Sequence, residues 1–189
     1  MDENILGHLQ NLTRFSNKTA YQLGAMYYEA FGINDFSLFV EYTRIRPYVY
    51  THKSLTDNHT AYGQIVGHHI GPNSDEIFVK TAYNLNEWIR PSLSFSYIRA
   101  GENIYEDGVL VRNVGGNVFE PYRPYIDSDD AVFLDGNRVN STEIIFSTRI
   151  EPVRDIIFDL SYTYLFRDHV TENYSSKLGF AELLMTLAF

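Results

Sequence analysis

Apolar and polar residues alternate over seven stretches of the chain, which is the pattern that predicts β-strands. The clearest stretch is 92–97, where Leu93, Phe95 and Tyr97 alternate with three serines. Because successive side chains of a strand point to opposite sides, this alternation gives each strand one apolar and one polar face. No stretch has the period of a convincing amphipathic helix. The strands are expected near residues 19–31, 35–48, 76–85, 89–100, 141–151, 155–167 and 174–189.

Short and long connections alternate between these strands, and this alternation bears on the fold class. Short turns at one end and long loops at the other are typical of an outer-membrane barrel, whereas a β-sandwich more often mixes lengths at both ends. The long loop after the fourth strand could hold an extra hairpin formed by 110–117 and 130–134. The short breaks lie near 32–35, 86–88 and 152–155, the long loops near 49–74 and 102–140, and a moderate one near 168–173.

The polar face carries charges of both signs, which would meet bulk water in a sandwich and a lumen in a barrel. Tyrosines toward the strand ends favour the barrel, since aromatic residues form girdles at the two membrane interfaces. The charged residues are Glu41, Lys80, Arg90, Glu143, Arg149, Asp159 and Glu182. The tyrosines are Tyr42, Tyr48, Tyr83, Tyr97, Tyr162 and Tyr164.

The predicted fold is therefore all-β: an antiparallel transmembrane β-barrel of the outer-membrane type, incomplete, with about seven C-terminal strands and long extracellular loops. The odd strand number and the absence of a signal peptide predict that 1–189 is the C-terminal part of one barrel domain. An eighth strand within 1–18 or 102–140 remains an alternative. Phe189 ends an alternating strand, and we expect it to be the signal read by the barrel-assembly machinery.

Composition excludes several classes of protein. The 189 residues include 24 Asp and Glu against 15 Lys and Arg, a net charge of −9, which argues against binding nucleic acid. The absence of cysteine excludes disulfide scaffolds, zinc–thiolate sites and catalytic cysteines. No apolar run approaches the roughly 18 residues of a membrane helix.

Two segments resemble the capsule assembly Wzi family of outer-membrane proteins. They are 41–52 (EYTRIRPYVYTH) and 62–76 (YGQIVGHHIGPNSDE), and the similarity extends from about Tyr21 to Phe189. The resemblance implies a large antiparallel barrel in the bacterial outer membrane, of which an N-terminal part with its plug would precede this chain. It implies a non-enzymatic, lectin-like role in binding or organising capsular polysaccharide at the cell surface.

The loop that includes these segments has the residue types that bind sugars, which are aromatic faces and hydrogen-bonding His and Asn side chains. A structural interpretation competes with this one: Gly63, Gly67, Gly71 and Pro72 suggest fixed turns that fold the loop into the barrel mouth. The candidate ligand contacts are His52, His59, Tyr62, His68 and Asn73.

Arg44 and Arg46 lie on the face that is apolar up to Tyr42, so either the strand has left the membrane there or a bulge exchanges the faces. They are candidates to bind a polysaccharide carboxylate or a lipid phosphate. An ion pair with Glu41 or with a loop acid is the favoured alternative.

No metal, cofactor or catalytic residue is predicted. Imidazole suits zinc, copper or nickel, but His68 and His69 are adjacent and are expected to point apart. The chain has no GxSxG, HExxH or phosphate-loop motif, so we do not expect an enzyme.

The expected partners are capsular or other surface polysaccharide, outer-membrane lipid or lipopolysaccharide, and the barrel-assembly machinery. Two other functions stay open: an outer-membrane pore for small solutes and a soluble β-sandwich carbohydrate-binding module.

Overall fold

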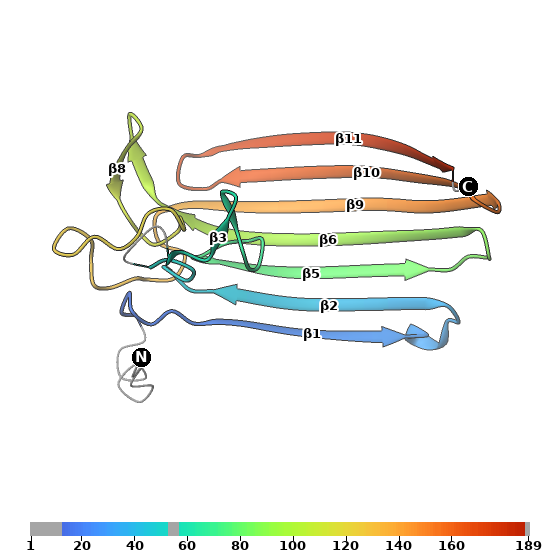
Figure 1. Cartoon of the computed structure of the whole chain (residues 1–189), viewed down its shortest axis with the longest axis horizontal. Coiled ribbons are helices and arrows are strands. Elements are labelled where there is room, and N and C mark those ends of the chain that lie inside the picture. The colour runs from blue at the N-terminus through green and yellow to red at the C-terminus, as the bar shows by residue number, and fades with distance from the viewer. Residues whose placement is uncertain (1–12, 53–56, 188–189) are drawn as a thin grey trace.

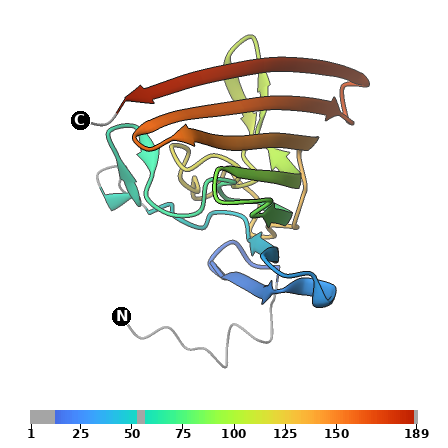
Figure 2. The same ribbon diagram turned by 90° about the vertical axis from the view of Figure 1, so that its right-hand side faces the viewer.

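The computed structural model describes residues 13–52 and 57–187, and its main element is a seven-stranded antiparallel sheet. Strands that follow one another in the sheet also follow one another along the chain, and β1 and β11 form the edges (Figure 1). Seen from one end of the strands, the sheet is twisted (Figure 2). Its strands are β1 (Ala20–Tyr28), β2 (Phe36–Ile45), β5 (Ser74–Tyr83), β6 (Ile89–Glu102), β9 (Asn137–Val153), β10 (Ile156–His169) and β11 (Tyr174–Leu187).

The all-β, antiparallel character predicted from the alternation is confirmed, and each of the seven predicted ranges overlaps one strand of the sheet. The described residues form an open sheet. They contain no second large sheet, as a β-sandwich would require. β2 ends at Ile45, earlier than predicted, because Pro47 has no N–H to donate and Tyr48 has a positive φ of 63°. The predicted strand end at Phe189 lies outside the described residues.

Short turns join the strands at one end of the sheet, whereas the other end has two long loops and one short connection (Figure 1). The turns are 29–35, with the 3₁₀ helix η1 (Ala30–Gly32), 84–88 and 154–155, and the loops are 46–73, 103–136 and the four-residue 170–173. No helix among the described residues has the length and apolar character needed to cross a membrane. We call the two ends of the sheet the turn end and the loop end.

The long loops contain two short hairpins, and one of them corrects the sequence analysis. The first pairs β3 (Thr60–Ala61) with β4 (Gln64–Ile65). In the second loop β7 (Ile104–Glu106) pairs with β8 (Val109–Arg112), so a hairpin of 110–117 with 130–134 was the wrong prediction. The turn of this hairpin is Asp107-Gly108, and both residues have positive φ, as a tight hairpin turn requires.

The strand register places the apolar positions of all seven strands on one side of the sheet, the apolar face. At one level across the sheet, Val40 pairs with Val79, Val79 with Phe95, Phe95 with Ile144 and Ile144 with Tyr164. The opposite side, the polar face, carries every charged strand residue that the sequence analysis assigned to it. The pairing of β2 with β5 has no register shift, so no bulge exchanges the faces near Arg44.

The hydrophobic core lies at the loop end, and the apolar face contributes nothing to it. Among the described residues, the buried apolar side chains of the strands are Ile45 and Val139, both on the polar face, and the others lie in loops or a turn. By contrast, Leu93, Phe95 and Phe146, in the middle of the sheet, are 48%, 38% and 47% exposed. A large apolar surface without cover marks a site of contact with a membrane or another protein. The loop members of this core are Tyr48, Val49, Val114, Val118 and Ala131, and Ala30 is buried separately in the turn 29–35.

Tyrosine positions agree only partly with the predicted girdles. Tyr42 and Tyr97 lie near the loop end of the apolar face and Tyr83 ends β5 at the turn end. Tyr162 and Tyr164 lie near the middle of β10 instead.

Tyr48 is also not a girdle residue, because it is 1% exposed in the loop core. Its ring lies edge-on to Phe15 and Tyr122, and its hydroxyl donates to the carbonyl of Asn113 at 3.0 Å. Burial raises the pKa of Tyr48 well above its usual value. Tyr48 thereby joins the first loop to the second.

Asn73 fixes the end of the first loop against the second, and a substitution there tests the fold. Its buried side-chain amide donates to the carbonyls of Gly101 (2.8 Å) and Asp135 (3.1 Å) and accepts from the N–H of Leu134 (2.7 Å). Asn73→Ala leaves these three groups without that partner, and unsatisfied buried groups cost about 1–3 kcal/mol each before relaxation. We expect Asn73→Ala to lower the free energy of unfolding by about 2–4 kcal/mol, measured by urea titration in detergent micelles with far-UV circular dichroism.

The matched control is Asn84→Ala, at an exposed asparagine in a turn at the other end of the sheet. Equal unfolding midpoints for the two variants would contradict the structural role of Asn73.

Candidate functional site

The first long loop folds back over the polar face of the sheet, where its histidines meet strand carboxylates. His68 Nε2 lies 3.4 Å from Thr43 Oγ1, 3.8 Å from Glu41 Oε1 and 3.8 Å from Glu76 Oε2. Thr43 and Glu41 belong to β2 and Glu76 to β5, all on the polar face. The loop therefore covers the loop end of this face, whereas its predicted position in a barrel mouth stays a prediction, because the described residues form an open sheet.

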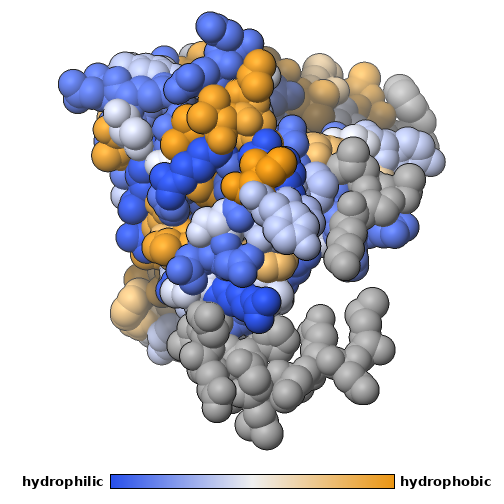
Figure 3. Space-filling model, turned by 90° about the vertical axis from the view of Figure 1, so that its left-hand side faces the viewer, coloured by the Kyte–Doolittle hydropathy of each residue, from blue (hydrophilic) through white to orange (hydrophobic). Residues whose placement is uncertain are grey.

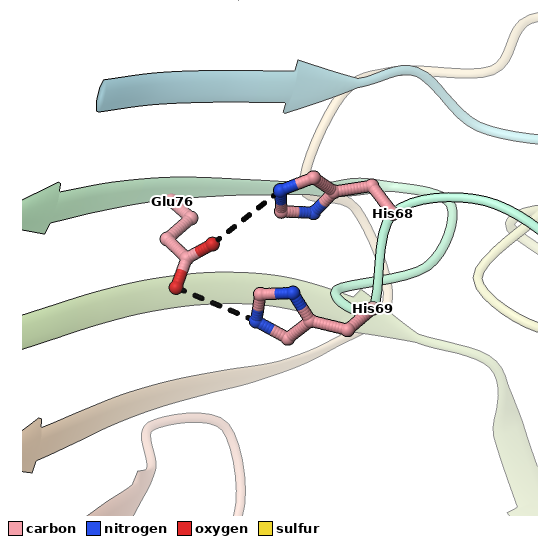
Figure 4. A group of neighbouring side chains, drawn as sticks. All are labelled: His68, His69 and Glu76. Atoms are coloured by element: carbon pink, nitrogen blue, oxygen red, sulfur yellow. Dashed lines mark ion pairs between the residues drawn. The ribbon is translucent and has the colours of Figure 1, made fainter. Parts of the chain in front are cut away.

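His68, His69 and Glu76 form a compact group, the histidine–glutamate cluster (Figure 4). His69 Nε2 lies 3.5 Å from Glu76 Oε1, and the two imidazole rings are 4.6 Å apart, centre to centre. Both rings point toward the same carboxylate (Figure 4). The expectation that His68 and His69 point apart is wrong, because His68 lies in irregular backbone and His69 in a turn, and neither lies in an extended strand.

Contacts on either side fix the positions of these side chains. A Cβ at Gly67 would lie 2.8 Å from the Tyr50 ring, so only glycine permits this approach, and the Tyr50 hydroxyl accepts the His68 N–H at 3.3 Å. Glu76 is 3% exposed and accepts a hydrogen bond of 2.5 Å from Ser96 Oγ on β6. The cluster is thus held by the loop on one side and by two central strands on the other.

Three of the predicted ligand contacts lie at the surface of the loop end. His52 and His59 are exposed, with rings 5.5 Å apart, and the backbone N–H of His52 donates to Asn58. Tyr62 is fully exposed at the tip of the β3–β4 hairpin. These side chains are accessible to a ligand, but the structure does not bring Tyr62 into contact with the histidines.

Asn73 is not a ligand contact in this structure, which corrects the prediction. The side chain is completely buried, and both ends of its amide hydrogen-bond to protein groups. Its residue type suggested sugar binding, but its position between the two loops makes it structural.

The ion pairs favoured for Arg44 and Arg46 are absent from the described part of the chain. Arg44 places its guanidinium 3.8 Å above the ring of Phe133, in a cation–π contact. Arg46 is half-buried, and burial and the nearby Arg44 lower its pKa. The acid opposite Arg44, Asp75, pairs instead with Arg99 through two hydrogen bonds of 2.8 and 2.5 Å.

Two carboxylates of the acidic second loop form ion pairs with arginines of the same loop. Arg123 donates two side-chain hydrogen bonds to Asp127, which raise the pKa of Arg123. Asp129 accepts from the Tyr122 hydroxyl at 2.5 Å, and Arg112 pairs with Asp135. These three carboxylates therefore have partners within the loop itself.

The surface at the loop end is mostly hydrophilic with scattered apolar patches (Figure 3). Tyr125, like Tyr62, is fully exposed, although the sequence analysis did not single it out. A hollow of about 220 Å³ lies beside β8, between Arg112 and the segment 126–135. Exposed aromatic rings beside polar side chains are suited to stacking on sugar rings.

The chain was compared with protein families, curated proteins and solved structures. No family model, no curated protein and no solved structure matches the chain.

Proposed function

We propose that this chain is part of a bacterial outer-membrane β-barrel that binds or organises capsular polysaccharide at the cell surface, without enzymatic activity. The uncovered apolar face of the sheet carries this proposal. The choice of polysaccharide as the ligand comes from the resemblance of segments 41–52 and 62–76 to the capsule assembly Wzi family.

The distribution of side chains suits lipid on one face and a lumen on the other. The polar face has buried polar side chains, such as Thr43, Ser96 and Thr163, whereas Leu93 and Phe95 on the apolar face are exposed. In water this arrangement would be unfavourable, because apolar surface is stabilised by leaving water. In a bilayer the same side chains meet hydrocarbon, so the arrangement becomes favourable.

Strand lengths fit the thickness of a membrane. A tilted strand needs about 9–11 residues to cross the hydrocarbon core. The strands of the sheet range from the 9 residues of β1 to the 17 of β9.

A polar row ends the apolar face at the loop end. Register pairs Arg44 with Asp75, Asp75 with Arg99, Arg99 with Asn140 and Asn140 with Asp168. Such a row belongs at the level of lipid headgroups, where its charges keep contact with water and phosphate. The loops beyond this row then face the cell exterior.

The two edges of the sheet impose a further requirement. An open sheet edge in lipid leaves backbone groups without partners, so membrane strands occur in closed barrels. β1 and β11 must therefore pair with additional strands, from further sequence or from another copy of the chain.

The position of the loops favours binding over free passage of solutes. The first loop lies on the polar face, where His68 reaches Glu41 and Glu76 on adjacent strands. It would narrow the barrel interior, which weakens the alternative of an open pore. The exposed Tyr62 and Tyr125 would present aromatic rings to an external polysaccharide.

Neighbouring substitutions on the central strand β6 test the membrane placement. Leu93→Arg puts a charge on the apolar face, at a cost of about 2–4 kcal/mol near the bilayer midplane, whereas Ser94→Arg puts it on the polar face. We expect Leu93→Arg to reduce strongly the yield of heat-modifiable, lipid-inserted protein, and Ser94→Arg to leave it near the unaltered value. The proposal would be contradicted if both variants inserted equally well. It would also be contradicted if the unaltered chain folded but did not insert into lipid.

Tyr62 and Tyr125 test the polysaccharide role. Replacement of an aromatic ring by alanine removes the surface on which a sugar ring can stack. The double variant Tyr62→Ala with Tyr125→Ala should therefore weaken binding of the source bacterium's capsular polysaccharide at least about tenfold, or about 1.4 kcal/mol. Binding is measured by retention of the detergent-solubilised chain on immobilised polysaccharide. Trp88→Ala, at an exposed aromatic residue of the turn end, is the control and should bind normally. If the double variant binds as well as the control, the loop tyrosines do not form the binding surface.

A further inference from the structure

We propose that the histidine–glutamate cluster is a binding site for a divalent transition-metal ion of the zinc type, with His68, His69 and Glu76 as protein ligands. The site would join the first loop to the polar face of the sheet. This inference depends on the geometry of the cluster and not on the placement of the sheet in a membrane.

The spacing of the candidate ligand atoms is close to that of a metal site. One ligand atom from each residue can be chosen so that all three lie within 4.8 Å of one another. Two atoms that each lie about 2.1 Å from a tetrahedral Zn²⁺ are about 3.4 Å apart. His69 Nε2 lies 3.5 Å from Glu76 Oε1 and His68 Nε2 lies 3.8 Å from Glu76 Oε2, so the two imidazoles approach the two oxygens of one carboxylate and would have to move closer together around an ion.

The charges around the cluster favour a cation. The ion pairs of Glu41 and Glu76 within the described residues are all with histidines, which are charged only when protonated. Glu76 is 3% exposed, and a buried carboxylate needs a positive partner. A divalent ion bound to neutral imidazoles would supply that charge, and Glu41 Oε1, 3.8 Å from His68 Nε2, is near enough to add a carboxylate.

Neighbouring contacts resemble the outer shell of a metal site. Ser96 Oγ donates to Glu76 Oε1 and thereby orients the carboxylate, as hydrogen bonds to ligating carboxylates commonly do. His68 Nδ1 is buried and has no hydrogen-bond partner in the part of the chain that the structure describes. An imidazole that binds a metal through Nε2 usually donates its other N–H to a partner, so the outer-shell contact that supports this site is the hydrogen bond from Ser96 and not His68 Nδ1.

The ligand set selects the kind of ion. Imidazole suits zinc, copper and nickel, whereas calcium and magnesium prefer sites made of oxygen ligands. Two histidines and a glutamate also leave a fourth position open to water or to an oxygen of a bound molecule.

Cobalt(II), a coloured stand-in for zinc, is the probe for the test. The full 189-residue chain in detergent micelles is titrated with Co²⁺, followed by visible absorption, and the bound Co²⁺ is then displaced with Zn²⁺. We expect one ion per chain, displaced by Zn²⁺ and not by Ca²⁺. His69→Ala removes a side chain that is 67% exposed, and Glu76→Gln keeps the shape of the side chain and an oxygen for Ser96. Each should weaken Co²⁺ binding by about tenfold to a hundredfold or more, since loss of outer-shell partners alone has effects of that size.

The control is His59→Ala, at an exposed histidine of the same loop outside the cluster, and it should bind Co²⁺ as the unaltered chain does. Far-UV circular dichroism and urea midpoints without metal show that each variant is folded as the unaltered chain is. Absence of saturable binding would overturn the inference, as would binding that survives both His69→Ala and Glu76→Gln in folded protein. Displacement of Co²⁺ by Ca²⁺ would overturn the assignment of the ion.

Discussion

The structure depends on one constraint: seven strands place their apolar side chains on the same face, and no element of the described chain covers it. Burial of apolar surface is the main force that stabilises folded proteins, so this face requires an apolar neighbour. The core at the loop end cannot meet the requirement, because it forms from loops and from polar-face residues such as Ile45 and Val139. Under the proposed function, lipid on the apolar face would satisfy the constraint, and the polar row through Arg44, Asp75 and Arg99 would lie where the hydrocarbon ends.

The same constraint bears on the polar face and on the two long loops. With lipid outside, the polar face becomes the wall of an interior, and charged strand residues such as Arg149 and Asp159 pair there at 2.8 Å. The first loop lies on this face and sets His68 and His69 against Glu76. Tyr62 of the first loop and Tyr125 of the second loop are fully exposed, whereas Glu76 of the histidine–glutamate cluster is buried.

Features set by local alternation were predictable from the sequence, whereas those set by tertiary contacts were not. Leu93 and Ser94 were assigned to opposite faces correctly, because a strand's faces follow from its own residues. The end of β2 was missed, since the positive φ of Tyr48 reflects its packing against Phe15 and Tyr122 in the loop core. The joint orientation of His68 and His69 was missed for the same kind of reason. That orientation depends on how the loop folds back and on the close approach of Gly67 to the Tyr50 ring. A glycine in the sequence indicates a turn, but it does not indicate which residue it packs against.

Lipid contact of the apolar face is the central claim, and the absence of cysteine allows it to be measured directly. Single cysteines introduced in turn at positions 92 to 97 of β6, labelled with a fluorophore, report their surroundings through quenching by lipids brominated in the acyl chain. We expect quenching with a period of two, strong at 93, 95 and 97 and weak at 92, 94 and 96. Quenching that is uniform along the strand, or absent from all six positions in folded protein, would contradict it.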